Sequence, residues 1–96
     1  MTREEIEKIL QELYPILHRK FKVKRIGLFG SFVKNRQTEK SDIDILVSFF
    51  EPVGLEFFEA QSLLEEKLGK KVDLVPDDCI KPEFKEMILQ EVSYIE

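Results

Sequence analysis

Two acidic residues interrupt a segment that is otherwise typical of a buried β-strand. Asp42 and Asp44 alternate with aliphatic side chains in the run Ser41-Asp42-Ile43-Asp44-Ile45-Leu46-Val47. Residues two apart on a strand point to the same face, roughly 6.5–7 Å apart along the backbone. Their carboxylates can therefore converge on one divalent cation, or on two cations about 3.5–4 Å apart. Carboxylate ligands without nearby His or Cys favour Mg²⁺ or Mn²⁺ over Zn²⁺.

A third acid strengthens this interpretation. An isolated Asp-x-Asp pair is more often two solvent-facing acids at a strand edge. Asp73, however, interrupts a second strand-like run, Lys70-Lys71-Val72-Asp73-Leu74-Val75. If the two strands are neighbours, three carboxylates share one face, and their mutual repulsion must be offset by metal. In a two-metal site, such a third acid can coordinate the metal that activates an attacking hydroxyl and accept its proton. Asp77 and Asp78 compete for this role, but after Pro76 they are typical of a turn.

A Gly-Ser pair ten residues before the acids is typical of a phosphate-binding turn. Gly30 permits close approach of the backbone to a phosphate, and Ser31 can cap a following helix while its amide and hydroxyl face the ligand. Lys34, one helical turn later, could add a positive charge. The alternatives are an ordinary strand-to-helix turn and a surface lysine. Together with the acids, the pair predicts metal-dependent chemistry on a nucleotide.

Apolar periodicity indicates the elements that must position these residues. A capping box of Thr2 and Glu5 opens a predicted helix over residues 3–19, whose last turn Pro15 should kink or shorten. The next segments are a strand at 23–29, a short helix or turn at 31–34, a loop at 35–40 and a central strand at 42–49. A helix at 55–68 and a strand at 71–76 follow. A last helix begins at Pro82, and its apolar stripe is Phe84, Met87, Ile88, Val92 and Ile95. This order predicts an α/β domain with a small sheet covered by helices. It leaves the strand directions open.

Composition narrows the class of protein. The chain has 96 residues, which fits one domain over residues 1–96, and its net charge of −4 argues against direct binding of nucleic acid. The single Cys79 fits a reducing compartment. The first residues are unlike a signal peptide, and the apolar runs are too short to span a membrane, so we predict a cytoplasmic protein without membrane contact. A homo-oligomer is left open.

Eight phenylalanines include two adjacent pairs. Strand and helix spacing predicts that Phe49-Phe50 and Phe57-Phe58 are mainly core residues. Some of them must nevertheless point outward, so Phe50 or Phe57 could belong to a partner interface.

The three-part pattern resembles the DNA polymerase β-type nucleotidyltransferase superfamily. The pattern consists of Leu28-Phe29-Gly30-Ser31-Phe32, the Asp42–Asp44 run, and Val72-Asp73-Leu74-Val75. The compact chain is similar to the minimal nucleotidyltransferase (MNT) domain proteins, over nearly its whole length. This resemblance implies a polymerase β-type nucleotidyltransferase fold, a small mixed β-sheet packed with helices.

The resemblance also implies an activity and a partner. Asp42 and Asp44 would hold two Mg²⁺ ions, Asp73 would complete the site, and Gly30 with Ser31 would bind the triphosphate of ATP. In MNT–HEPN pairs the small enzyme is an antitoxin that transfers AMP from ATP to a tyrosine of a HEPN ribonuclease toxin encoded by a neighbouring gene.

One departure from the family pattern and two other functions remain to be weighed. Many relatives carry Ala-Arg-Gly where this chain has Val33-Lys34-Asn35, and a lysine keeps the charge but lacks the bidentate fork of arginine. One alternative function is a small-molecule nucleotidyltransferase like the aminoglycoside-modifying relatives. The other is a non-catalytic antitoxin that only covers its partner.

Overall fold

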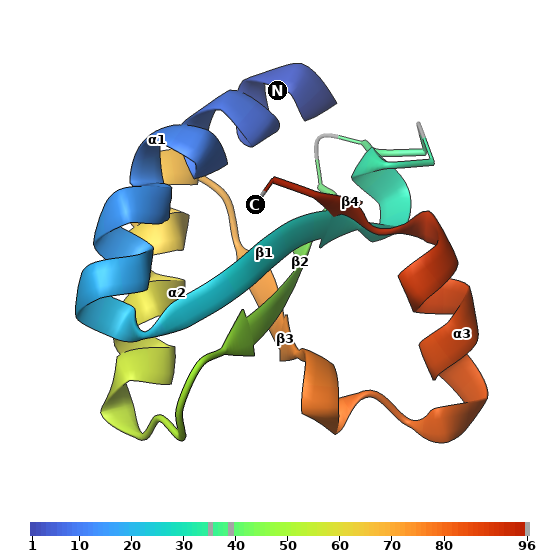
Figure 1. Ribbon diagram of the computed structural model, residues 1–96. Helices are drawn as coiled ribbons and strands as arrows, with labels where there is room; N and C mark the ends of the chain where they lie inside the picture. The colour runs from blue at the N-terminus through green and yellow to red at the C-terminus, as the bar shows by residue number, and fades with distance from the viewer. Residues whose placement is uncertain (35, 39, 96) are drawn as a thin grey trace.

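A mixed four-stranded sheet forms the centre of the computed structural model, which describes residues 1–34, 36–38 and 40–95 (Figure 1). In chain order the described elements are α1 (Arg3–Phe21), β1 (Val23–Phe29), the 3₁₀ turn η1 (Gly30–Phe32), β2 (Ile43–Phe49), α2 (Leu55–Leu68), β3 (Val72–Pro76), the 3₁₀ turn η2 (Asp77–Cys79), α3 (Pro82–Glu91) and β4 (Ser93–Tyr94). Within the described residues, none of the helices is long and apolar enough to cross a membrane.

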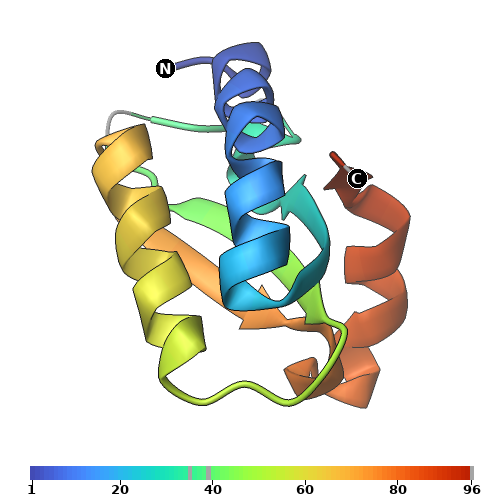
Figure 2. The ribbon, with the colours of Figure 1, turned by 60° about the vertical axis from the view of Figure 1, so that its left-hand side comes forward.

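The strands lie in the order β3-β2-β1-β4. β2 runs parallel to β3 and antiparallel to β1, while β4 pairs antiparallel with the other side of β1. α1 and α2 lie side by side over one face of the sheet, and α3 lies away from them, beyond the opposite face (Figures 1 and 2). The predicted mixed sheet covered by helices is confirmed.

The period-two pattern of β2 separates the core from the acidic face. Ile43, Ile45 and Val47 point into the buried cluster beneath α1 and α2. Asp44 points the other way, as the alternation predicts. The aliphatic face of β2 is therefore held by the hydrophobic core. This packing fixes the direction in which Asp44, on the opposite face, points.

The first helix is longer than predicted. The Thr2–Glu5 capping box is present, with Thr2 N donating to Glu5 Oε1 at 3.0 Å and Glu5 N donating to Thr2 Oγ1 at 3.2 Å. Pro15 lies inside α1, which continues to Phe21 and ends at Lys22, a residue with a left-handed backbone (φ 64°). The predicted shortening at Pro15 is wrong, because burial of Leu17 and Phe21 stabilises the last turn.

The end of the chain also differs from the sequence prediction. The last helix stops at Glu91, so Val92 and Ile95 are not part of a helical stripe. Instead, β4 adds a short edge strand in which Tyr94 pairs with Gly27. The strand was missed because its two residues give no periodic signal. In the predicted 35–40 loop, residues 36–38 and 40 are described and lie outside regular strands and helices, whereas Asn35 and Glu39 lie outside the described residues.

Candidate functional site

The parallel pairing of β2 with β3 brings two of the predicted acids together. Asp44 and Asp73 are register partners in this ladder, so their side chains project from the same face of the sheet. Asp42 lies two residues before Asp44, just before β2 begins, and is exposed. The condition set by the sequence, that the third acid lies on the neighbouring strand, is met.

Gly30 lies directly against Asp44. Phe29, at the end of β1, is the antiparallel register partner of Asp44, and Gly30 then turns away with φ +78°. A Cβ at Gly30 would lie within 2.2 Å of Asp44 Oδ2. The backbone N–H of Ser31 is close enough to the Asp44 carboxylate to favour its charged form and so to oppose the rise in its pKa. The Gly30-Ser31 turn and Asp44 therefore form one unit, in which only a glycine at position 30 leaves room for the Asp44 carboxylate.

The environment of Asp44 disfavours its charged form. Burial raises the pKa of this carboxyl group to about 6, assisted by the negative charges of Asp73, Asp42 and Glu91, while the Ser31 N–H acts in the opposite direction. An acid crowded by other acids gains from a cation, because a cation reverses the sign of the local field.

This raised pKa predicts a pH-dependent effect of Asp44→Asn on stability. A carboxyl group with a folded pKa near 6 and a reference value of 3.8 contributes stability below pH 4 and loses it as the pH rises through 6. The full difference corresponds to roughly 3 kcal/mol, which solvent screening of this half-buried group reduces to about 1 kcal/mol. At pH 8 in EDTA, urea denaturation should show the variant more stable by about this amount, with the gain vanishing near pH 4. A gain independent of pH would contradict the interpretation, and Asp77→Asn, at an exposed turn, is the control.

The acids have the donor chemistry that Mg²⁺ prefers, since all are carboxylates. Among the described residues, however, no three His, Cys, Asp or Glu side chains are arranged closely enough to hold a metal ion. Asp44 leans onto the Gly-Ser turn, whereas Asp42 and Asp73 are exposed. Asp44 and Asp73 fit a Mg²⁺ site in the type of ligand and in the face of the sheet that they share.

A shallow cavity of about 350 Å³ opens beside these acids, and α3 forms its outer wall. Asp44, Asp73 and Gly30 line its inner side, and apolar residues of the 80–88 segment line the other, namely Ile80, Phe84, Met87 and Ile88. A polar floor with an apolar wall can accommodate a ligand that is charged at one end and apolar at the other.

Glu91 is a residue of this site that the sequence analysis missed. Its Oε1 accepts the N–H of Gly30 at 3.1 Å, and its Oε2 lies 3.0 Å from Lys34 Nζ. Lys34, predicted as a phosphate ligand or a surface lysine, is thus paired with an acid 57 residues later. No sequence pattern predicts the contact of Glu91 with Gly30 and Lys34, because a contact between residues so far apart in the chain depends on where α3 ends.

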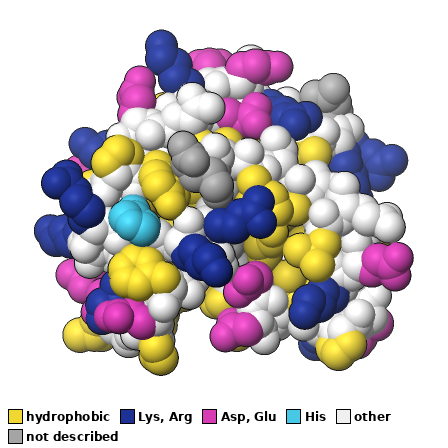
Figure 3. Space-filling view, viewed as in Figure 1, with side chains coloured by type: hydrophobic (Ala, Val, Ile, Leu, Met, Phe, Trp, Pro, Cys, Tyr) yellow, Lys and Arg dark blue, Asp and Glu magenta, His cyan; other side chains and the backbone are white. Residues whose placement is uncertain are grey.

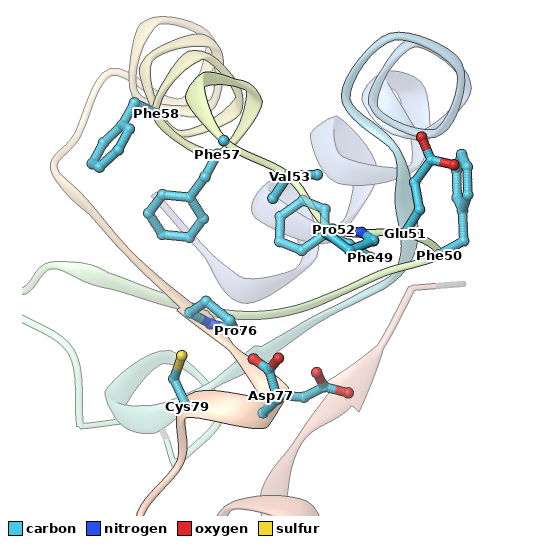
Figure 4. A pocket seen from close by; sticks show the side chains of 12 residues that line it. Phe49, Phe50, Glu51, Pro52, Val53, Phe57, Phe58, Pro76, Asp77 and Cys79 are labelled. Carbon is cyan, nitrogen blue, oxygen red and sulfur yellow. The ribbon is translucent and has the colours of Figure 1, made fainter.

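A wider hollow of about 860 Å³ lies near the other end of β2 (Figure 4). Phe49 and Phe57 lie beside it and pack against the core, while Phe50 and Phe58 lie at its two ends, 49% and 62% exposed. The predicted core placement is therefore wrong for Phe58, whereas the exposure of Phe50 agrees with the outward position that the sequence left open for it. The ring of Phe50 lies 5.3 Å from that of His18. The single histidine, cyan in Figure 3, has hydrophobic side chains beside it on the surface. None of the three predicted acids lines this hollow.

Comparison with known proteins identifies relatives over the whole chain. Residues 3–95 match the family model described as the nucleotidyltransferase domain. A candidate protein adenylyltransferase of Methanocaldococcus jannaschii is 50% identical, with 98% of each chain covered. The protein adenylyltransferase MntA of Thermococcus cleftensis is 44% identical, with 99% of this chain and 97% of that protein covered.

Two solved structures share the fold. A candidate minimal nucleotidyltransferase has a TM-score of 0.82 and 30% identity, covering 97% of this chain and 95% of that chain. A toxin–antitoxin structure with AMP-PNP has a TM-score of 0.71 and 25% identity, covering 100% of this chain and 73% of that chain.

Proposed function

Because this chain belongs to the nucleotidyltransferase domain family, we propose that it transfers AMP from ATP to a hydroxyl group of a protein partner. The observation that carries the proposal is the shared face of Asp44 and Asp73 beside the Gly30-Ser31 turn. This arrangement puts cation ligands next to a turn suited to phosphate. The similar Thermococcus protein, named a protein adenylyltransferase, supports a protein acceptor.

The reaction assigns a task to each side chain. The acceptor hydroxyl oxygen attacks the α-phosphorus, the bond from that phosphorus to the bridging oxygen of the β-phosphate breaks, and pyrophosphate leaves. Asp73 accepts the hydroxyl proton, which its exposed position allows. Gly30, Ser31 and Lys34 bind the phosphates. Asp42, Asp44 and Asp73 would hold two Mg²⁺ ions, which would supply charge stabilisation for the phosphoryl oxygens.

The acceptor is proposed to be a tyrosine of a HEPN ribonuclease toxin encoded by a neighbouring gene, with this chain as its antitoxin. The similar solved toxin–antitoxin structure with AMP-PNP supports a toxin as the partner and ATP as the substrate.

A double-label assay tests this proposal. The toxin, purified without nucleotide, is incubated with this chain, Mg²⁺, and ATP labelled on either the α- or the γ-phosphate. We expect α-label on the toxin and all γ-label in pyrophosphate, because the α,β bond is the one that breaks. Replacing the acceptor tyrosine with phenylalanine should abolish labelling, and EDTA should do the same.

The other outcomes separate the competing functions. Transfer of γ-label to the toxin would mean phosphoryl transfer and would contradict the proposal. Tight binding without label would favour a covering antitoxin, and α-label on a small acceptor without the toxin would favour the small-molecule enzyme.

A further inference from the structure

The Glu91 carboxylate holds the two donors that a phosphate group would use. It bridges the Gly30 N–H, at 3.1 Å, and Lys34 Nζ, at 3.0 Å, and the side chain is only 15% exposed. A backbone N–H beside an ammonium group is a typical binding arrangement for phosphate oxygens, and a carboxylate is the side chain that imitates it. An internal anion therefore takes the place at the turn that suits an anionic ligand.

This position has an electrostatic cost. Glu91 brings a negative charge to a face that already carries Asp44 and Asp73, and its charge is one of the causes that raise the pKa of Asp44. Its hydrogen bond to Gly30 and its ion pair with Lys34 offset the repulsion. If a more highly charged anion takes those two donors, this offset is lost and the repulsion remains.

The helix that carries Glu91, α3, is attached lightly to the rest of the molecule. Every side chain of α3 is at least partly exposed, with Phe84 at 48% and Met87 at 50%. β4 is held more firmly, because it pairs with β1 at two positions, Ile95 N donates to Ile26 O at 2.8 Å and Ile95 packs against the core. Segments with few buried contacts open at a low free-energy cost. Displacement of Glu91 therefore requires little of the hydrophobic core to be disturbed.

We propose that Glu91 is an internal competitor of the nucleotide, which a triphosphate must displace from Gly30 and Lys34 in order to bind. This inference rests on the proposed function, since it takes these two donors to be triphosphate ligands. Displacement frees the end of α3, so occupancy of the nucleotide site is coupled to the position of residues 82–91. Glu91 thus lowers the affinity for the nucleotide. When the nucleotide displaces Glu91, α3 loses this attachment and becomes looser.

Calorimetric titration of the full chain tests this role. ATP and inorganic tripolyphosphate, each with Mg²⁺, are titrated into wild type, Glu91→Ala and Glu91→Gln, and adenosine serves as a probe without phosphate. We expect about tenfold tighter binding of both phosphate probes by Glu91→Ala, since one charge-assisted contact no longer competes. Glu91→Gln, which preserves the shape of the side chain, should bind them several-fold tighter. Adenosine binding should stay constant.

A matched control separates displacement from a general effect of charge. Glu83→Gln removes the same charge from the exposed first turn of α3 and should leave affinity unchanged. Repeating the titration in 0.5 M NaCl screens distant charges. An equal gain in Glu83→Gln, or a gain that disappears at high salt, would overturn the proposal.

Hydrogen exchange provides a structural readout. Tripolyphosphate should speed amide exchange over residues 82–91 in wild type, whereas Glu91→Ala should exchange fast there already. Unchanged or slower exchange in wild type would overturn displacement. If wild type binds the probes and transfers AMP but the Glu91 variants bind no tighter, only the role of Glu91 fails. If wild type and every variant ignore both phosphate probes, the proposed nucleotide site fails with it.

Discussion

Replacing Asp44 with Asn is expected to reduce the rate of AMP transfer by on the order of 10³-fold or more. The carboxylate is a proposed ligand of the cation that offsets phosphate charge, and stabilisation of this kind contributes several kcal/mol to a transition state. Single-turnover labelling of the toxin with α-labelled ATP measures the loss. Because the same change should make the apo protein more stable at pH 8, unfolding would not explain inactivity.

Variants of the other acids give this experiment its internal comparison. Asp42→Asn should lose as much activity as Asp44→Asn. Asp73→Asn should also slow transfer, because Asp73 is the proposed proton acceptor. Asp77→Asn, in the exposed turn η2, should keep the wild-type rate. Wild-type rates in both Asp42→Asn and Asp44→Asn would show that the site is assigned to the wrong residues. Neutralisation of the toxin by the inactive variants would show that covering alone suffices.

Gly30→Ala is expected to abolish transfer at a modest cost in stability. Its φ of +78° is unfavourable for alanine by about 1 kcal/mol, and the new Cβ would lie within 2.2 Å of Asp44 Oδ2. Asp44 can relieve this clash only by rotating its carboxylate, which moves the proposed cation ligand away from the Ser31 N–H. We expect the rate of transfer to fall by at least about 10²-fold. The free energy of unfolding, measured on the same variant, should fall by about 2 kcal/mol.

Gly69→Ala is the matched control, because Gly69 has a similar φ of +67° with open space around it. This variant should pay the same backbone cost of about 1 kcal/mol and retain the wild-type rate. The difference between the two alanine variants therefore isolates the contact with Asp44. Equal activities would mean that the position of the Asp44 carboxylate does not matter for transfer.

Local sequence patterns were sufficient for most of the secondary structure. β1 and α2 begin and end where the apolar periodicity places them, at Val23–Phe29 and Leu55–Leu68. These segments have strong periods and clear ends, such as Gly69 after α2, so neighbouring residues carry the information. The same patterns failed at Pro15 and after Glu91. There, tertiary packing outweighed the proline, and a two-residue strand formed by pairing with β1.

The sequence by itself predicted three acids and the Gly-Ser turn as candidate site residues, and the side of β2 to which Asp44 points. Alternation along one strand sets this direction, because its period of two is a local property of the backbone. Only the tertiary structure decided that Asp73 is the register partner of Asp44 and that Glu91 reaches Gly30 from 61 residues away. The register of separate strands and the end of an exposed helix depend on packing between distant segments, which local spacing does not encode.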